Sequence, residues 1–250
     1  MTREVTGVNW KQCGQLMVFE WTNTPYYLYL LNGALAILAG YFGAQVIPEM
    51  LQAENKVMGL DVVFIFGLII NAYLYRPKVF TLNEVKNNLH VAPIQLMLRQ
   101  MAIKPETIMT SRMLANSIMI LGWSIIFLIS FHRLLPTQTL TEMFPHFLSF
   151  SCVWVLLVLV LAGMIPAAEP GDVMKPVEIF FWLIVITLIG GMLVLGVRFM
   201  TGSFLFEWVL LGVKTMPLLL PILLLPLLVV ANLFWSYYMK RYLRRTNYDV

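Results

Sequence analysis

Long apolar runs alternate with short polar connections along most of this chain. A helix needs roughly 20 apolar residues to cross about 30 Å of hydrocarbon. One run, 62–75, is short for a crossing, so we expect its helix to begin before Asp61 or to continue through Val79. The pattern predicts an all-α polytopic membrane protein with six transmembrane helices, at 26–47, 62–75, 113–131, 147–165, 177–200 and 216–238.

Two further segments have the length and pattern of helices that do not cross. In residues 1–24, helical spacing places four apolar side chains on one face, as in an amphipathic helix lying in the membrane interface. These side chains are Trp10, Cys13, Met17 and Trp21. Residues 201–215 are apolar but short and contain Glu207, so we expect a re-entrant or interfacial segment.

Composition supports a membrane protein. The chain is 60% hydrophobic and 12% charged, with a mean hydropathy of +0.79, whereas soluble domains are about a quarter charged. Its spans and short loops leave no room for a soluble catalytic domain of about 100–200 residues. We therefore expect residues 1–250 to form a single transmembrane domain, with any such activity supplied by a partner.

The distribution of lysine and arginine predicts orientation. With six spans, the side that holds both termini carries about three quarters of the 17 lysines and arginines. Cytoplasmic loops carry such an excess. We expect a multi-pass protein of the cell (cytoplasmic) membrane with both termini cytoplasmic.

The longest polar stretch, 76–112, then lies in the cytoplasm. Apolar residues recur at helical spacing in two sets separated by Pro93, which predicts two short amphipathic helices broken near Ala92. The sets are Leu82, Val85 and Leu89, then Ile94, Met97, Leu98 and Met101. Proline and an acid at Pro105 and Glu106 predict the start of the next helix. Alternatively, the loop only sets topology and meets anionic lipid headgroups.

Small and amide side chains mark candidate contacts inside the membrane. A stripe of small residues permits close approach of another helix, within the chain or in a second subunit; it consists of Gly33, Ala36, Gly40 and Ala44. Buried amides more often join helices than bind substrate, but they are also candidates for a translocation path: Asn71, Asn116 and Asn232.

Motifs for catalysis are missing from the sequence. No phosphate-binding loop, metal-ligand spacing or G-x-S-x-G segment occurs, so we expect no catalytic residue and no metal site. Cys13 and Cys152 are interpreted as apolar fillers. The predicted spans hold almost no ionisable residue away from their ends, which disfavours an ion-coupled carrier and favours a substrate held by apolar contact.

The order of these elements resembles the permease of a type-2 ABC exporter. The resemblance is sharpest at residues 84–88, EVKNN, followed by residues 101–112, MAIKPETIMTSR. The sequence departs from the family pattern at Asn88, where many members have glycine, and at Ala102, where many have proline.

The resemblance implies a division of labour between subunits. A second permease, identical or not, would share the translocation path, and separate ABC ATPase subunits would bind ATP and Mg. Residues 82–103 would form the coupling helix, with contacts to the ATPase from Leu82, Glu84, Val85, Lys86, Leu89, Lys104 and Glu106.

The same resemblance implies export of an amphipathic or hydrophobic substrate such as a peptide, lipid or drug. The chain itself would be no enzyme and would bind no cofactor and no nucleic acid, with membrane lipid around it. A membrane-integral enzyme and a secondary carrier remain the alternatives.

Overall fold

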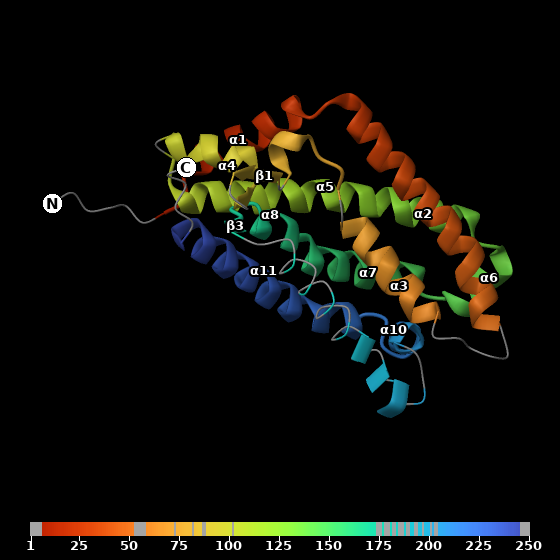
Figure 1. The fold of residues 1–250 in the computed structure, drawn as a ribbon. Helices are drawn as coiled ribbons and strands as arrows, with labels where there is room; N and C mark the ends of the chain where they lie inside the picture. Colours follow the sequence, from red (N-terminus) through yellow and green to blue (C-terminus); the bar gives the residue numbers. More distant parts are fainter. Residues whose placement is uncertain are drawn as a thin grey trace.

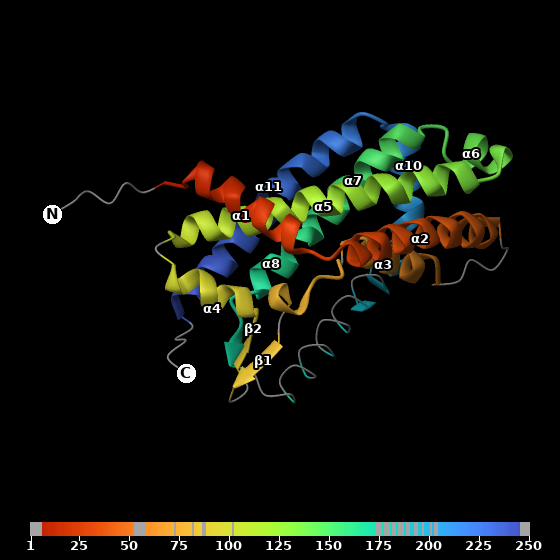
Figure 2. The ribbon, with the colours of Figure 1, turned by 90° about the horizontal axis from the view of Figure 1, so that it is seen from above.

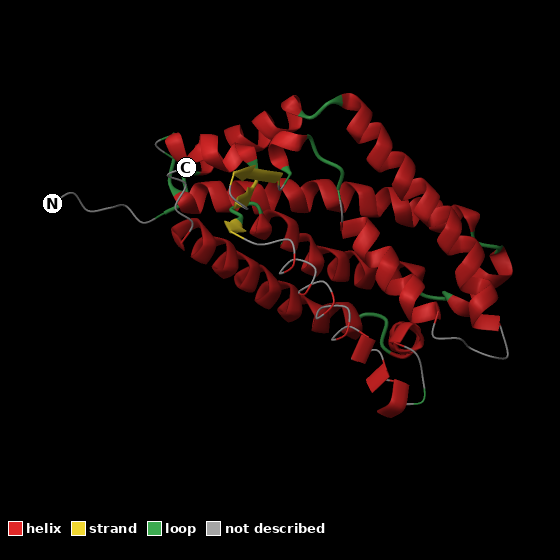
Figure 3. Cartoon of the chain, viewed as in Figure 1, coloured by secondary structure: helices red, strands yellow, loops and turns green. Residues whose placement is uncertain are grey.

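The computed structural model describes residues 7–52, 59–72, 74–81, 83–86, 89–101, 103–173, 202 and 205–245, with isolated residues between 177 and 200. Helices dominate (Figures 1 and 3). The elements are α1 (Trp10–Asn23), α2 (Tyr26–Gln52), α3 (Gly59–Ala72), the 3₁₀ helix η1 (Lys78–Phe80), β1 (Asn83–Lys86), β2 (Leu89–Val91), α4 (Pro93–Gln100), α5 (Pro105–Leu134), α6 (Thr137–Met143), α7 (Phe147–Ala162), α8 (Met164–Ala168), β3 (Asp172–Val173), α10 (Leu205–Thr215) and α11 (Leu219–Arg245).

Four described stretches are long and apolar enough to cross a membrane: Tyr26–Glu49, Pro105–Leu134, Phe147–Ala168 and Leu219–Leu243. They coincide with the first, third, fourth and last predicted spans. The protein is thus a helical membrane protein. The predicted fifth span, 177–200, lies largely outside the described residues.

The predicted second span is a shorter helix. α3 has 14 residues and begins at Gly59, before Asp61, which was one of the two expected extensions. At 1.5 Å per residue it is about 21 Å long, less than the hydrocarbon thickness.

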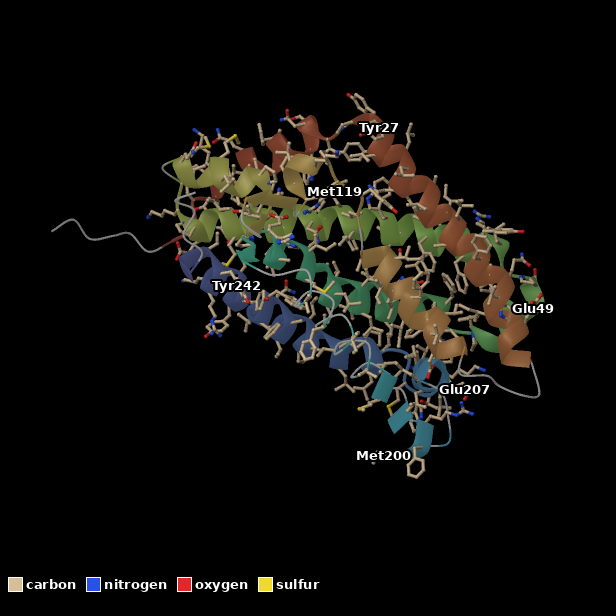
Figure 4. All side chains as sticks on the ribbon, in the orientation of Figure 1. Tyr27, Glu49, Met119, Met200, Glu207 and Tyr242 are labelled. Atoms are coloured by element: carbon tan, nitrogen blue, oxygen red, sulfur yellow. The ribbon has the colours of Figure 1, made fainter. Side chains whose placement is uncertain are left out.

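The bundle has two distinct ends. We call the end formed by α1, α4, the three strands and the start of α5 the sheet end (Figure 2). The opposite end holds α6 and α10. In Figure 4, Glu49 and Glu207 lie at this opposite end, away from Tyr242 near the end of α11.

Aromatic side chains form the core between α3, α5, α7 and α10. The Trp154 ring stacks on Phe127 with centroids 4.8 Å apart and meets Phe64 edge-on at 5.5 Å. Phe206 of α10 packs against Phe64 at 5.0 Å. The core therefore attaches the short helix α10 to the spans.

Asp61 makes a second attachment of α10. Its buried carboxylate accepts hydrogen bonds from the backbone N–H groups of Leu205 and Phe206, both at 3.0 Å. A carboxylate at this position satisfies helix-start donors and faces the positive end of the helix dipole. The predicted segment 201–215 contains this eleven-residue helix, which is too short to span.

The small-residue stripe of α2 lies against α5 of the same chain. A Cβ added at Gly40 would lie 2.8 Å from Ser130 Cβ and 2.9 Å from the Phe127 carbonyl oxygen. Ala36 and Ala44 are buried. Helices gain little from apolar contact with each other in lipid, so close packing of their backbones stabilises the α2–α5 pair instead.

The predicted first helix of the 76–112 loop is wrong. Residues 83–86 and 89–91 are strands, and β2 pairs on its other edge with β3, matching His90 with Asp172. This backbone pairing with a distant segment outweighs the helical spacing of the apolar residues. Leu82 lies outside the described residues.

The later half of the loop follows the prediction. α4 begins at Pro93, and α5 begins at Pro105 with Glu106 in its first turn. In both helices proline occupies the first turn, where its missing N–H costs nothing. Of the predicted apolar set, Ile94 and Leu98 are buried, whereas Met97 and Met101 are exposed.

Gly40→Ala should lower the thermal stability of the detergent-solubilised protein, because the new methyl group would press on α5 backbone atoms. Overpacking of this kind costs about 1–3 kcal/mol. The matched control is Gly33→Ala on the same helix, where the added Cβ would meet Trp123 at an ordinary 3.4 Å. Equal melting temperatures for the two variants would contradict the described packing of α2 on α5.

Candidate functional site

Four buried charged side chains meet at the sheet end. They are Glu20 of α1, Arg76 before η1, Arg112 of α5 and Glu169 after α8, and we call them the charge cluster. None of the four side chains is more than 8% exposed. Charged groups are rarely buried this deeply unless they are paired.

Glu169 is the centre of the cluster. Its Oε1 accepts hydrogen bonds from Arg76 Nη1 and Arg112 Nη2, each at 2.7 Å. Its Oε2 accepts from Arg112 Nε at 2.7 Å and from Gln95 Nε2 of α4 at 3.1 Å. Arg112 therefore binds the carboxylate with two parallel N–H groups, the strongest geometry for this pair.

Glu20 closes the cluster from the other side. Arg112 Nη1 donates to its carboxylate, and Arg76 Nη2 lies 3.4 Å from Oε1. Asn116 adds a neutral link, since its Oδ1 accepts from Arg76 Nη2 and its Nδ2 donates to the Ala162 carbonyl, both at 2.7 Å.

Two carboxylates and two guanidinium groups give the cluster a formal charge of zero. Their mutual attraction is strong in a medium of low dielectric constant and offsets the cost of removing four ions from water. Loss of one member would leave an uncompensated buried charge, at a cost of about 3–5 kcal/mol. The cluster thus holds α1, α4, α5 and α8 in one arrangement.

The cluster also joins the two ends of the polar stretch 76–112. We call residues 78–101, which contain η1, β1, β2 and α4, the insertion. Arg76 precedes the insertion and Arg112 follows it, and both bind Glu169. The Glu169 carbonyl accepts a hydrogen bond from Ala92 N at 3.1 Å, so the insertion is attached at its two ends and in its middle.

A glycine adapts the backbone where β3 meets the insertion. Gly171 has φ 73°, and a Cβ there would collide with the carbonyl oxygen of His90. Only glycine combines this left-handed conformation with so close an approach. β3 can therefore run directly beside β2.

The residues predicted to contact an ATPase lie in or beside the insertion. Glu84 and Lys86 pair by register with His90 and Leu89, and Val85 lies in β1 between them. Lys104 precedes α5 and is exposed. Glu106 forms an ion pair with Lys240 of α11 at 3.1 Å, and both side chains are about 40% exposed.

The three predicted translocation-path amides are not brought together. Asn116 is hydrogen-bonded to Arg76 of the charge cluster. Asn71 lies on α3, and Asn232 on α11, where its Nδ2 donates to the Leu228 carbonyl of its own helix at 2.9 Å. The structure gives each of them a separate environment.

Sequence reasoning missed the charge cluster. Glu20 lies seven residues after Cys13, on the same face of α1, and both are buried. The available signal was the presence of isolated acids beside membrane spans, since such charges usually have a partner. Spacing along the chain could not identify which arginine each acid would meet.

The described residues contain no group of three or more His, Cys, Asp or Glu side chains placed to hold a metal ion. The arrangement at the sheet end is therefore one of ion pairs and hydrogen bonds. Its chemistry suits mechanical attachment.

Comparisons with known proteins add no identification. No protein-family model, no curated protein and no solved structure matches the chain.

Glu20→Gln should detach α1 from α5 and expose Cys13. Cys13 is 1% exposed, and burial raises the pKa of its thiol, so both access and reactivity should increase on detachment. In a Cys152→Ala background we expect at least about a tenfold faster reaction of Cys13 with a small maleimide. The rate is measured by mass spectrometry of the intact protein.

Glu49→Gln is the matched control, because Glu49 is an exposed glutamate at the opposite end. It should leave the Cys13 rate unchanged. An unchanged rate in Glu20→Gln, or an equal increase in both variants, would contradict the attachment of α1 through the cluster.

Proposed function

We propose that the protein is the transmembrane subunit of an ATP-driven ABC exporter. In this proposal it forms the translocation path with a second permease, identical or not, and separate ABC ATPase subunits bind ATP and Mg. The observation that carries the proposal is the attachment of the insertion through Arg76 and Arg112 to the charge cluster. The family resemblance at residues 84–88 and 101–112 supplies the identity of the motor.

The attachment supports a mechanical role for the insertion. A movement of the insertion would act on α5 through Arg112, on α1 through Glu20 and on the α7–α8 region through Glu169. Coupling between distant sites is carried by packed elements and hydrogen-bonded networks with discrete arrangements. An insertion joined by flexible linkers would absorb such a movement without transmitting it.

α4 takes the role of the coupling helix in this proposal. Within residues 82–103 the structure describes one helix, Pro93–Gln100. Met97 of this helix and Met101, which directly follows it, are exposed, as is Phe19 of α1. These three side chains line an apolar groove of about 490 Å³ between α1 and α4. Methionine-rich surfaces adapt to a partner, and a helix face beside a groove is a common docking mode.

The proposed orientation follows the excess of lysine and arginine, with both termini and the insertion in the cytoplasm and the spans in the cell membrane. The ATPase would then meet the sheet end. The apolar side chains exposed along α11 suit contact with lipid and with a second permease. The proposed substrate is amphipathic or hydrophobic: a peptide, a lipid or a drug.

A secondary carrier is the second candidate, and the buried ion pairs are the observation that favours it. Ionisable residues within membrane bundles often serve proton relays. The cluster, however, is neutral, and each of its carboxylates binds both arginines, which favours attachment over proton exchange. A carrier would transport substrate under an ion gradient with no ATPase present.

The double variant Met97→Glu and Met101→Glu should release the ATPase. Buried charge replaces apolar contact at a proposed interface centre, where each lost anchor costs at least about 1–2 kcal/mol. We expect at least about a tenfold loss of co-purified ATPase when the chain is expressed together with its proposed ABC ATPase. Because both methionines are exposed, the melting temperature of the permease itself should not change.

Met216→Glu is the matched control, since Met216 is similarly exposed but lies between α10 and α11 at the opposite end. It should retain the ATPase. Full retention of an active ATPase by the double variant would contradict docking at α4.

Arg112→Lys should separate ATPase binding from transport. Lysine keeps the charge but loses the two parallel N–H groups that hold Glu169. We expect the ATPase to remain bound while substrate transported per ATP hydrolysed falls several-fold in proteoliposomes. Lys240→Arg is the control, because its exposed ion pair with Glu106 contributes at most about 1 kcal/mol; equal transport yields in the two variants would contradict coupling through the cluster.

A further inference from the structure

A small cavity lies between α2, α3 and α5, beside the charge cluster but separate from it. Its volume is about 240 Å³, and its described lining is mostly apolar, with Ala36, Ile69, Ile70 and Leu74 among the residues. An apolar cavity of about 150 Å³ can already bind benzene, whereas drug-sized ligands occupy roughly 300–1,000 Å³. The space therefore fits part of a small molecule.

One wall of the cavity is fixed by backbone hydrogen bonds. Asn32 of α2 donates from Nδ2 to the Tyr75 carbonyl at 3.1 Å, and its Oδ1 accepts from Tyr75 N at 3.0 Å. This amide binds both backbone groups of Tyr75 and holds the chain after α3 against α2. The cavity is preformed, which lowers the cost of ordering it around a ligand.

Two other polar groups of the lining have no partner among the described residues: Asn71 Oδ1 and Trp123 Nε1. Asn71 is 95% buried, and its Nδ2 donates to the Gly67 carbonyl at 3.2 Å. Because a carbonyl can only accept, the amide orientation is determined and Oδ1 is left as an acceptor. Trp123 Nε1 can only donate.

Asn71 Oδ1 lacks a donor and Trp123 Nε1 lacks an acceptor among the described residues. An unsatisfied buried acceptor or donor costs about 1–3 kcal/mol, and a hydroxyl can donate to one group while accepting from another. The described lining has no Asp, Glu, Lys, Arg or His, so a charged headgroup would be desolvated without compensation. The ligand chemistry is therefore uncharged, with an apolar body and a hydroxyl.

The route of access favours a ligand from the membrane. Ile69 and Tyr75, which line the cavity, are 47% and 45% exposed, and they belong to the outer face of an apolar helix and the residues after it. A hydrocarbon tail could leave the cavity past these side chains into lipid.

We propose that this cavity binds an uncharged membrane amphiphile through a hydroxyl that donates to Asn71 Oδ1 and accepts from Trp123 Nε1, with its apolar chain directed past Ile69 and Tyr75. The site lies within one chain and does not depend on the ATPase or on a second permease. If the cavity binds no such ligand, the proposed transport function is unaffected. If the transport function is wrong, the proposed ligand site is likewise unaffected.

Photolabelling of the full-length protein in phosphatidylcholine nanodiscs tests the site. The probe is a dodecanol that carries a diazirine in its chain, and the comparison is the matching diazirine-bearing dodecane without the hydroxyl. Tryptic peptides 57–78 and 113–133 contain Asn71 and Trp123, respectively, and mass spectrometry measures their labelling. We expect the alcohol to label them about three- to tenfold more than the hydrocarbon, the ratio that one or two net hydrogen bonds would give.

Asn71→Leu and Trp123→Phe should each reduce labelling by the alcohol toward the level of the hydrocarbon, because each removes one of the two proposed hydrogen bonds. Asn232→Leu is the matched control, because Asn232 also donates to the carbonyl four residues earlier in an apolar helix but does not line the cavity. It should leave labelling unchanged. Equal labelling by alcohol and hydrocarbon, full labelling of both cavity variants, or an equal loss in Asn232→Leu would overturn the proposal; if one cavity variant fails to fold, the other decides.

Discussion

The carboxylate of Glu169, bound by two arginines away from water, is the interaction on which the sheet end depends. Its four short contacts join residues from before η1, from α4 and from α5. In lipid, helices gain little from apolar contact with each other because the solvent is equally apolar. Ion pairs and close backbone approach therefore determine how these spans are arranged, the first at the sheet end and the second along α2 and α5.

The two ends of the bundle are held together by different interactions. At the sheet end, charges hold the insertion, α1 and α8 together, whereas the opposite end relies on aromatic packing and on the Asp61 carboxylate at the start of α10. A partner that moved the insertion would meet a stiff connection to several spans at once. Residues 74–76 connect the two proposed sites: Leu74 and Tyr75 line the ligand cavity, and Arg76 belongs to the charge cluster.

Local signals in the sequence predicted four of the spans and the starts of α4 and α5, because run length and proline position act over a few residues. They failed at β1 and β2, where strand pairing replaces the helix that the apolar spacing predicts: β1 pairs with β2, and β2 pairs with β3, some 80 residues later. They also failed at Glu20 and Glu169, whose partners are distant in sequence. The stripe of α2 was recognised, but spacing alone could not show that Gly40 faces Ser130 of the same chain.

The order of the cluster residues along the chain has a consequence for biogenesis. A ribosome releases Glu20, Arg76 and Arg112 before Glu169, so the nascent chain holds an excess positive charge at the membrane boundary while α5 and α7 are being inserted. That charge can stay hydrated at the interface until its last carboxylate arrives. Closure of the sheet end is therefore a late step of maturation, and insertion of the early spans must precede it.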